Sequence, residues 1–257
     1  MLPVSWRPIG VKGLIRVGPN EDGGYVLPLP LLKSTDMLLG FGLSTDWRFE
    51  EEFRGRSGCK VECYDHTINP AFWRRKVVTD SAGFLAGPQR FTWSKFRYML
   101  KYREYRRFFS RPEVIHHQLK VGYDGDGSVS LKTILARITT ESVFLKIDIE
   151  GWEYRIMEDL VNTPDNVLGF VMELHDIDLH RDRISAFIEK LGSFSVVHLH
   201  ANNGGGTDPG GDPLVVEITF ARSALVEVLP EQHRDYPIAG LDYANAPSMP
   251  DLPLRFG

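Results

Sequence analysis

The segment MLLGFGLSTDWRFEEEFRGRSGCKVECYD, residues 37–65, decides the fold of this chain. It begins with the apolar run 37–42, continues as a helical pattern over 47–56, and ends in a second strand-like run, 59–65. A strand, a helix and a second strand in this order form a βαβ unit, whose two strands lie parallel in one sheet. The segment therefore predicts an α/β fold.

The first strand of this unit ends in a turn that contains Gly40 and Gly42 and leads into the helix, with Thr45 or Asp46 as its expected N-cap. Glycine lets the backbone approach a ligand closely, and a helix N-terminus offers free N–H groups. The second strand ends in Asp65, where an acid is placed to accept hydrogen bonds from a ribose diol. The pattern indicates an adenosine-type cofactor, NAD or S-adenosylmethionine; a tight βα turn without a ligand is the alternative.

The sequence of the glycine turn favours S-adenosylmethionine over a dinucleotide. The dinucleotide fingerprint G-x-G-x-x-G needs a third glycine where this chain has Thr45, which is followed by Asp46. Such a loop is poor in donors for a pyrophosphate. An acidic loop suits a cofactor that has a cationic centre and no phosphate.

The alternation of strands and helices continues towards the C-terminus. Further strands are expected at 142–151, 166–176, 194–203 and 213–223, with helices at 152–160 and 179–192. Each connection is long enough for a right-handed crossover. We therefore predict one domain over residues 1–257, built on a mostly parallel, Rossmann-like sheet.

Three regions fall outside this alternation. Residues 1–35 contain turn signals at Pro19-Asn20 and Gly23-Gly24 and form an N-terminal extension. Residues 68–125 form an insertion, predicted to be a helical lid region. The last 28 residues hold five of the 16 prolines, so we expect 224–257 to be an extended tail that wraps the surface.

Composition excludes several classes of protein. The 257 residues are 42% hydrophobic and 25% charged, with a formal charge of −4, which excludes disorder for the bulk of the chain. We find no run of about 18 apolar residues and no basic segment followed by an apolar one at the start, so we expect neither a membrane span nor a secretory signal. Cys59 and Cys63 lie four apart on one expected strand, too far for a disulfide. These features predict a cytoplasmic protein.

Polar side chains gather at the ends of three expected strands. They are Lys146, Asp148, Glu150, Glu173, His175, His198, His200 and Asn202. Because side chains alternate along a strand, Lys146, Asp148 and Glu150 should share one face. By the same alternation, Val197 and Leu199 should lie opposite the neighbouring histidines.

These polar residues allow two functional interpretations. Asp148, Glu173 and His175 could hold a divalent metal, Mg²⁺ or Mn²⁺, that orients a substrate hydroxyl. Alternatively, a histidine tuned by a carboxylate, His175 or His200, could act as the general base on that hydroxyl. The simpler alternative is that strand ends are polar, with His198 a satisfied core histidine.

With these residues in view, the chain resembles the FkbM-type family of S-adenosylmethionine-dependent methyltransferases. The most specific part is LKIDIEGWEYRIM, residues 145–157, which is similar to that family's Lys-Ile-Asp-Ile/Val-Glu-Gly-x-Glu signature. Similar stretches are EDGGYVLP (21–28), LLGFGLSTDWRFEEEF (38–53), KVECYDHT (60–67), VMELHDID (171–178), HLHANN (198–203) and LVVEITF (214–220). The resemblance covers roughly 15–222 and is weakest across 70–125. Members of the family generally methylate hydroxyls, often on sugars or sugar-bearing natural products.

The resemblance implies a class I methyltransferase sheet, mostly parallel with the last strand antiparallel, and S-adenosylmethionine as the cofactor. The residues that would bind the cofactor are Asp22, Gly23, Gly24, Tyr25, Gly40, Gly42, Ser44, Asp46, Asp65 and Asp148. The segment 22–25 would close over the cofactor, so that 1–35 is a cofactor-covering extension. The catalytic candidates are Asp148, Glu150, Glu173, His175 and His200, of which Asp148 and Glu150 would sit beside the methyl donor.

The chain departs from the commoner Asp-x-Gly-Ala-Asn-x-Gly motif of such enzymes at the first strand. Gly40 stands where that motif has its acid, and Ser44-Thr45-Asp46 ends the loop. Asp148 and Glu173 end adjacent strands much as the metal ligands do in catechol-type O-methyltransferases, but the lysine base of those enzymes has no counterpart here. That leaves His175 or His200 as the base.

A basic and aromatic segment, residues 90–111, interrupts the acidic remainder of the chain. It has eight Lys/Arg, one Glu and eight aromatic residues, a net charge of +7 that leaves −11 for the rest of the chain. One helical stripe comprises Tyr98, Tyr102, Tyr105 and Phe109, and a second comprises Trp93, Phe96 and Leu100. The segment is either an aromatic-packed helix with solvated arginines or a lid or docking helix that recruits a phosphorylated, lipid-linked or nucleic-acid substrate, with Arg103, Arg106 and Arg107 as its docking residues. A glycan that stacks on the aromatic rings, or contact with an anionic membrane surface, fits the same segment.

The sequence thus favours an S-adenosylmethionine-dependent O-methyltransferase that acts on a sugar hydroxyl of a glycan or glycosylated metabolite. One alternative is an NAD-dependent sugar oxidoreductase or epimerase, although we find no Tyr/Lys pair for hydride transfer. Another is a non-catalytic module that binds nucleic acid or an anionic surface through 90–111. We do not expect nucleic acid to be the partner.

Overall fold

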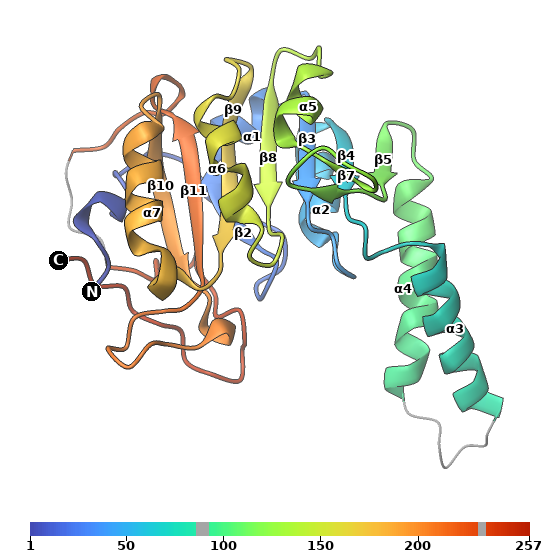
Figure 1. Cartoon of the computed structure of the whole chain (residues 1–257). Helices are drawn as coiled ribbons and strands as arrows, with labels where there is room; N and C mark the ends of the chain where they lie inside the picture. Colours follow the sequence, from blue (N-terminus) through green and yellow to red (C-terminus); the bar gives the residue numbers. More distant parts are fainter. Residues whose placement is uncertain (86–92, 231–234) are drawn as a thin grey trace.

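The computed structural model describes residues 1–85, 93–230 and 235–257, and it leaves out the side chains of 78–85 and 93–96. Its centre is a seven-stranded sheet (Figure 1). From one edge to the other, the strands are β10 (Phe194–Ala201), β11 (Val216–Arg222), β9 (Val167–Leu174), β8 (Val143–Ile147), β3 (Met37–Phe41), β4 (Lys60–Tyr64) and β5 (Val114–His117). The predicted α/β fold with a mostly parallel sheet is confirmed.

All strands of this sheet except β11 run in the same direction. β3 is parallel to β4 and β8, and the parallel pairing extends to β5 and β9. β11 lies between β9 and β10 and runs antiparallel to both. The chain order across the sheet reverses at β3 and β8, and in open α/β sheets this switch point is where ligands bind, outside the carboxyl ends of the strands.

Helices cover both faces of the sheet (Figure 1). One face carries α5 (Leu131–Ala136), α6 (Glu153–Val161) and α7 (Ile177–Lys190), and the other carries α1 (Leu29–Ser34) and α2 (Arg48–Ser57). Alternate residues of β3 enter separate cores: Leu39 packs with Ile156 of α6, whereas Leu38 packs with Phe53 of α2. Because all four side chains are at most 1% exposed, each contributes roughly 1.5–3 kcal/mol to folding.

The start of α2 and the end of β8 differ from the sequence-based expectations. Helix α2 has Trp47 as its N-cap instead of Thr45 or Asp46, although the Asp46 carboxylate accepts the Arg48 N–H at 3.1 Å. Strand β8 ends at Ile147, so the expected strand over 142–151 is too long at its C-terminal end. The acidic residues that follow β8 therefore lie in a loop.

A bulge in β10 changes which face its residues occupy. The register shifts between Val196 and His198, so the strict alternation that we predicted is wrong here. Val197 packs in the core under α1 and α2, and Leu199 packs in the core under α6 and α7. One extra residue in a strand has this effect because it moves the following side chains to the other face.

The insertion between β4 and β5 is a helical hairpin that projects from the edge of the sheet (Figure 1). It consists of α3 (Pro70–Leu85) and α4 (Trp93–Phe109). The predicted aromatic stripe of α4 is confirmed: Tyr98, Tyr102, Tyr105 and Phe109 pack as partly buried residues against one core. Of the second predicted stripe, Leu100 is 45% exposed, and the side chains of Trp93 and Phe96 lie outside the described residues. Helix α3 and strand β5 were not predicted.

Short elements complete the fold. The N-terminal region has η1 (Val4–Trp6) and an antiparallel hairpin of β1 (Leu14–Val17) and β2 (Tyr25–Pro28). A small sheet of β6 (Lys120–Val121) and β7 (Ser128–Val129) follows β5, η2 (Asn203–Gly205) follows β10, and η3 (Ser223–Leu225) follows β11. The tail then returns to the N-terminus, where Phe256 bridges Leu2.

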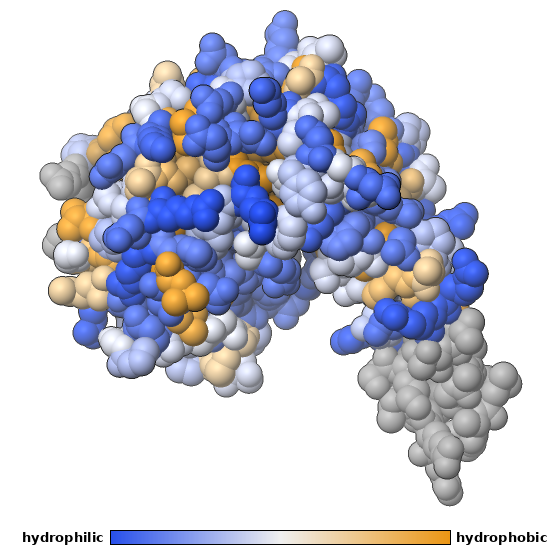
Figure 2. All heavy atoms as spheres, viewed as in Figure 1, coloured by the Kyte–Doolittle hydropathy of each residue, from blue (hydrophilic) through white to orange (hydrophobic). Residues whose placement is uncertain are grey.

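The face of the protein shown in Figure 2 is mostly hydrophilic, with small separate hydrophobic patches. In the described part of the chain, every helix is too short or too polar to cross a bilayer. Cys59 and Cys63 are both buried free thiols.

Candidate functional site

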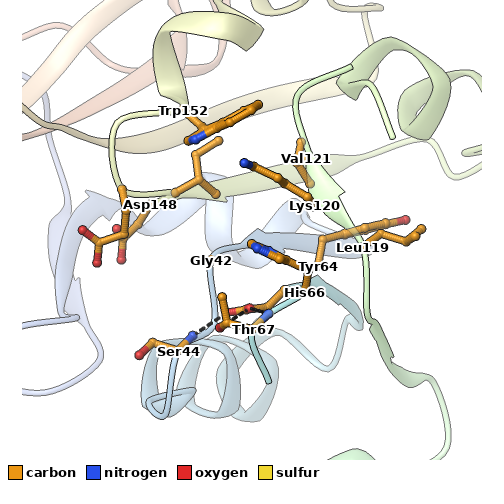
Figure 3. A pocket seen from close by; sticks show the side chains of 13 residues that line it. Gly42, Ser44, Tyr64, His66, Thr67, Leu119, Lys120, Val121, Asp148 and Trp152 are labelled. Carbon is orange, nitrogen blue, oxygen red and sulfur yellow. Dashed lines mark hydrogen bonds between the residues drawn. The ribbon is translucent and has the colours of Figure 1, made fainter. Parts of the chain in front are cut away.

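A cavity of about 380 Å³ opens at the carboxyl ends of β3, β4 and β8 (Figure 3). Its lining includes Gly42, Ser44, Tyr64, Asp65, His66, Thr67, Leu119, Lys120, Val121, Asp148, Ile149, Glu150 and Trp152. Its position is the one at which open α/β sheets bind ligands, and its volume lies within the range of about 300–1,000 Å³ that is usual for small-molecule sites. Four of the predicted cofactor residues, Gly42, Ser44, Asp65 and Asp148, line it together.

Gly42 brings the first strand's loop against the loop after β8. Its φ is +81°, and a Cβ atom at this position would collide with the Asp148 carbonyl. The Gly42 N–H donates to the Tyr64 carbonyl at 3.1 Å, and its own carbonyl accepts from Lys146 Nζ at 2.7 Å. The turn therefore requires glycine for both its backbone conformation and its close packing.

The Asp65 carboxylate organises the floor of the cavity. Its Oδ2 accepts the backbone N–H groups of Leu43 and Ser44 at 2.9 and 2.7 Å, and its Oδ1 accepts both the N–H and the hydroxyl of Thr67 at 2.6 Å (Figure 3). Burial raises the pKa of Asp65, but the hydrogen bonds from Thr67 and Ser44 outweigh burial and hold this pKa below its ordinary value. Asp65 thus fixes the loop after β3 to the loop after β4. A ribose diol would donate to the same two oxygens that already accept from Leu43, Ser44 and Thr67.

Trp152 and Lys120 both line the cavity. Lys120 Nζ lies 3.0 Å from the ring centroid of Trp152, and Figure 3 shows these two side chains next to each other. The Lys120 ammonium therefore covers the Trp152 ring in this structure. Leu119, Val121 and Ile149 supply the apolar part of the lining, which suits a ring-shaped ligand.

Glu50 of α2 supplies a buried carboxylate that the sequence did not point to. It is 1% exposed, and a Cβ atom on Gly40 would lie 2.9 Å from its Oε1, which has no hydrogen-bond partner among the described residues. Burial raises the pKa of Glu50 to about 7, although nearby Lys146 lowers it. Because Gly40 has no side chain, it leaves room for this acid from the neighbouring helix.

Lys146 joins the glycine turn to the acids at the ends of β8 and β9. Its Nζ lies 3.1 Å from Asp148 Oδ2, and only 6% of its side chain is exposed. Burial lowers the pKa of Lys146, but Asp148 and Glu50 raise it more, so this pKa lies above its ordinary value. Lys146 is therefore a buried cation that offsets part of the acidic charge.

Glu173 is the centre of the buried acidic cluster. Tyr25 donates its hydroxyl to Glu173 Oε2 at 3.2 Å, and Asn202 donates to Oε1 at 2.8 Å. Burial raises the pKa of Glu173 well above its ordinary value, and the neighbouring charges of Asp148 and Glu217 raise it further. A carboxylate in such surroundings binds a proton more readily than a free one.

His175 lies beside Glu173, as the alternation of β9 predicts. Its Nε2 is 3.8 Å from Glu173 Oε1 and 3.5 Å from Glu150 Oε2, and its Nδ1 is 3.3 Å from Glu153 Oε1. Burial lowers the pKa of His175, but Glu153 and Glu173 raise it to about 9. Glu150 follows the end of β8 with a φ of +53° and a side chain that is 86% exposed, so it stands at the rim of the cluster.

His200 lies between two carboxylates. Its Nδ1 is 3.2 Å from Glu217 Oε2, and its Nε2 is 3.1 Å from both oxygens of Asp251. Burial lowers the pKa of His200, but Asp251 and Glu217 raise it to about 10. His200 therefore carries a proton at neutral pH, which makes it a poor acceptor of another. The neighbouring His198 is 2% exposed, and its Nε2 lies 3.0 Å from Asp242 Oδ1, as a core histidine would.

The pairing of His200 predicts a dependence of stability on pH. Its pKa in the folded protein exceeds the value of about 6.5 of an unperturbed imidazole, so its contribution to stability is complete below pH 6.5 and is lost as the pH rises through about 10. We expect this residue to lower the free energy of unfolding by roughly 5 kcal/mol over that interval. Urea denaturation of wild type and His200→Gln at several pH values measures it, with the exposed His66→Gln as the control. If the free energy of unfolding of His200→Gln falls by the same amount over this pH interval, groups other than His200 cause the effect.

The N-terminal hairpin reaches the acidic cluster. Asp22 Oδ1 accepts from Asn202 Nδ2 at 3.4 Å and from Asn245 Nδ2 at 3.1 Å, and the Asp22 N–H donates to the Asn245 carbonyl at 3.2 Å. Tyr25 reaches Glu173, as described above. A Cβ atom on Gly23 would lie 3.8 Å from Asp46 Oδ2, and Gly24 is buried. The hairpin is thus held over β9 and β11, beside the loop that contains Asp46.

Two groups of three side chains bring possible metal ligands within 4.8 Å of one another. One comprises the predicted residues Asp148, Glu173 and His175. The other comprises Asp22, Glu173 and Glu217. Both groups share Glu173. In the first, the Lys146 ammonium and the raised pKa of His175 already oppose the acidic charge.

The three predicted docking arginines are all exposed on α4, but they face different surroundings. Arg106 lines a second cavity between α3 and α4, and Arg107 lines a hollow between α2 and α4. Arg103 lines neither of these two spaces. The three arginines therefore do not line one common cavity.

Comparison with solved structures returns several methyltransferases. No protein-family model and no curated protein sequence matches the chain. Among solved structures, the chain is similar to precorrin-6y C5,15-methyltransferase from Geobacter metallireducens, with 13% identity over 75% of this chain and 83% of that chain and a TM-score of 0.40. It is also similar to a 23S rRNA methyltransferase (12% identity, 78% and 66% coverage, TM-score 0.42) and to an rRNA methylase from Streptococcus thermophilus (8%, 75% and 89%, TM-score 0.39).

Because these TM-scores lie below 0.5, the fold is assigned from the strands themselves. Numbered along the chain, the seven strands of the sheet lie in the order 3-2-1-4-5-7-6, and only the last one is antiparallel. This order and direction confirm the predicted Rossmann-like sheet, mostly parallel with the last strand antiparallel. The cavity lies at the switch point of this sheet, where open α/β sheets bind ligands.

Proposed function

We propose that this protein is an S-adenosylmethionine-dependent O-methyltransferase that methylates a sugar hydroxyl of a glycan or glycosylated metabolite. The observation that carries the proposal is the acidic pair Asp148 and Glu173, which lies at the carboxyl ends of β8 and β9 beside the cavity at the switch point. A transferase that acts on a neutral hydroxyl needs a group that holds the departing proton, and this pair supplies carboxylates. The sequence resemblance at 145–157 supports the same assignment.

The residues around the cavity fit S-adenosylmethionine. Leu119, Val121 and Ile149 offer apolar surface for adenine, and Asp65 and the turn at Gly42 offer acceptors and a close backbone for the ribose. Asp148 provides negative charge for the cationic end of the cofactor. The bound cofactor would supply an activated methyl group on a sulfonium centre.

Glu173 is the residue that the geometry favours as acceptor of the proton from the substrate hydroxyl. Glu173 has a raised pKa, which makes it a stronger base than an ordinary carboxylate, and Tyr25 and Asn202 orient its oxygens. His175 is protonated at neutral pH, so its charge stabilises the unprotonated form of Glu173. We therefore assign Glu173 as the base and His175 as its positioning partner, in place of a histidine base.

A divalent metal is the second candidate for activating the hydroxyl, because Asp148, Glu173 and His175 bring possible ligand atoms together. The Lys146 ammonium competes for the same carboxylate, which favours the metal-free assignment. We expect activity to change less than twofold after dialysis against EDTA. A loss that added Mg²⁺ or Mn²⁺ restores would support the metal instead.

Incubation with methyl-labelled S-adenosylmethionine and a panel of glycans, followed by mass spectrometry, tests the proposed reaction. We expect the label on a sugar oxygen of at least one glycan. Label found only on nitrogen or carbon atoms of other acceptors would contradict O-methylation. Reduction or oxidation of an added nicotinamide cofactor, without methyl transfer, would support the NAD-dependent alternative.

A further inference from the structure

A second cavity, of about 510 Å³, lies between α3, α4 and the segment that follows β5. Its lining includes Trp73 and Arg74 of α3, Tyr102, Tyr105 and Arg106 of α4, and Gln118. Asn69 also lines this second cavity, only two residues after Thr67 of the first cavity, and Gln118 directly precedes Leu119 of the first. The residues that line the two cavities therefore follow each other closely in two segments of the chain, one after β4 and one after β5. The two cavities are nevertheless lined by different residues.

Trp73 forms the aromatic wall of the second cavity and has an unsatisfied donor. Its ring centroid lies 5.3 Å from that of Tyr102 and 5.2 Å from that of Tyr105. Trp73 is 4% exposed, and its indole N–H has no hydrogen-bond partner among the residues that the structure describes. A buried donor without an acceptor costs about 1–3 kcal/mol, so a ligand oxygen that reaches this N–H would remove that cost.

Two exposed arginines add positive charge to the same cavity. Within the described residues, neither Arg74 nor Arg106 has a carboxylate at ion-pair distance, unlike Arg111, whose Nη2 lies 2.6 Å from Glu51 Oε1. Guanidinium groups bind phosphate and carboxylate through paired N–H donors. A ligand that fits this cavity therefore combines an anionic group with a ring that can lie against Trp73 and an oxygen that can accept its N–H.

We propose that the α3–α4 cavity is a binding site for a pyranose that carries a phosphate or carboxylate group, separate from the cofactor cavity. The choice of a sugar ring rests on the proposed function, and the site then holds an anionic sugar unit of an extended acceptor. The sugar ring lies against Trp73 and accepts its indole N–H, Arg74 and Arg106 hold the anionic group, and the Gln118 amide reaches the remaining hydroxyls.

Tyr105 ties this cavity to the first one and is for that reason not a suitable test position. His116 Nε2 lies 3.0 Å from the Asp65 carbonyl, which can only accept, so Nε2 carries the hydrogen. His116 Nδ1 then accepts the Tyr105 hydroxyl, at 2.7 Å. Changing Tyr105 would disturb Asp65, whereas Arg106 and Trp73 have no such hydrogen bond within the described residues.

Isothermal titration with glucose 1-phosphate and with glucuronic acid, and separately with glucose and inorganic phosphate, tests the site directly. We expect 1:1 binding of at least one anionic sugar, at least tenfold tighter than either glucose or inorganic phosphate. Arg106→Ala and Arg74→Ala should each weaken it at least tenfold, and Trp73→Phe, which keeps a ring but removes the N–H, about fivefold. Arg97→Ala, on the same helix but outside this cavity, should change it less than twofold.

Several outcomes would overturn the inference. They are no binding of either anionic sugar at millimolar concentration, equal binding of inorganic phosphate, unchanged binding by Arg106→Ala, or binding of adenosine monophosphate without binding of the sugars. Titration of each variant with S-adenosylhomocysteine separates this inference from the proposed function. Retained cofactor binding with no sugar binding would reject only the second site, and the reverse result would reject the cofactor assignment.

Discussion

Replacing Gly42 with alanine is expected to abolish cofactor binding and to destabilise the protein by about 2–4 kcal/mol. The residue has a φ of +81°, which is costly for an L side chain, and the new Cβ would collide with the Asp148 carbonyl. Relief of that collision must move the β3 loop or the loop after β8, and both line the cofactor cavity. Isothermal titration with S-adenosylhomocysteine and urea denaturation measure the two effects, and we expect affinity to fall at least 100-fold.

Gly55 offers a matched control for the same substitution. It lies inside helix α2, and a Cβ atom there would have no neighbour within 4 Å. Gly55→Ala should stabilise the protein by about 0.5–1 kcal/mol, because alanine favours the helix, and should leave cofactor affinity unchanged. Unchanged affinity in Gly42→Ala would show that the glycine turn does not form the cofactor site.

Replacing Glu173 with glutamine is expected to lower kcat about 100- to 10,000-fold, as expected for removal of a general base. The base must be unprotonated, so kcat of the wild type should rise with pH through the raised pKa of Glu173, and this rise should be absent in Glu173→Gln. A pH series of methyl-transfer rates at saturating cofactor measures both effects.

The interpretation of Glu173→Gln depends on an intact cofactor site. We expect S-adenosylhomocysteine to bind this variant within fivefold of wild type, because Glu173 does not line the cofactor cavity. Glu189→Gln, an exposed position on α7, removes the same charge and should leave kcat unchanged. A Glu173→Gln enzyme with the wild-type rate and pH profile would contradict the assignment of Glu173 as the base, and His175 would then be the next candidate.

The parts of the fold that local sequence determines were predicted well. The run 37–65 contains its own apolar strands, its glycine turn and an amphipathic helix, and these appear as β3, α2 and β4. Helix α3 was not predicted, because its apolar residues do not form one clear stripe. Strand β5 was not predicted either: its four residues, Val114–His117, include two histidines and resemble no buried strand.

The sequence predicted which polar residues gather at the site, but not how they pair. Asp148, Glu173 and His175 lie at the carboxyl ends of two neighbouring strands, so their proximity follows from the order of the sheet. Glu50 was missed because its role depends on the packing of α2 against Gly40. The one signal in the sequence was that Gly40 stands where the commoner motif has an acid, which could have prompted a search for an acid elsewhere in the chain.

The partners of His200 show a second limit of sequence patterns. Its Nδ1 contacts Glu217 on the adjacent strand, as strand pairing allows, but its Nε2 contacts Asp251 in the tail. No periodicity relates 251 to 200. The raised pKa that makes His200 a poor base therefore follows only from the path of the tail in three dimensions.

Titration of the wild-type protein with S-adenosylhomocysteine tests the central claim most directly, because cofactor binding does not depend on knowing the acceptor. We expect one molecule to bind per chain with a dissociation constant in the micromolar range, and NAD at the same concentrations to give no heat. Binding of NAD without binding of S-adenosylhomocysteine, or of neither, would contradict the account.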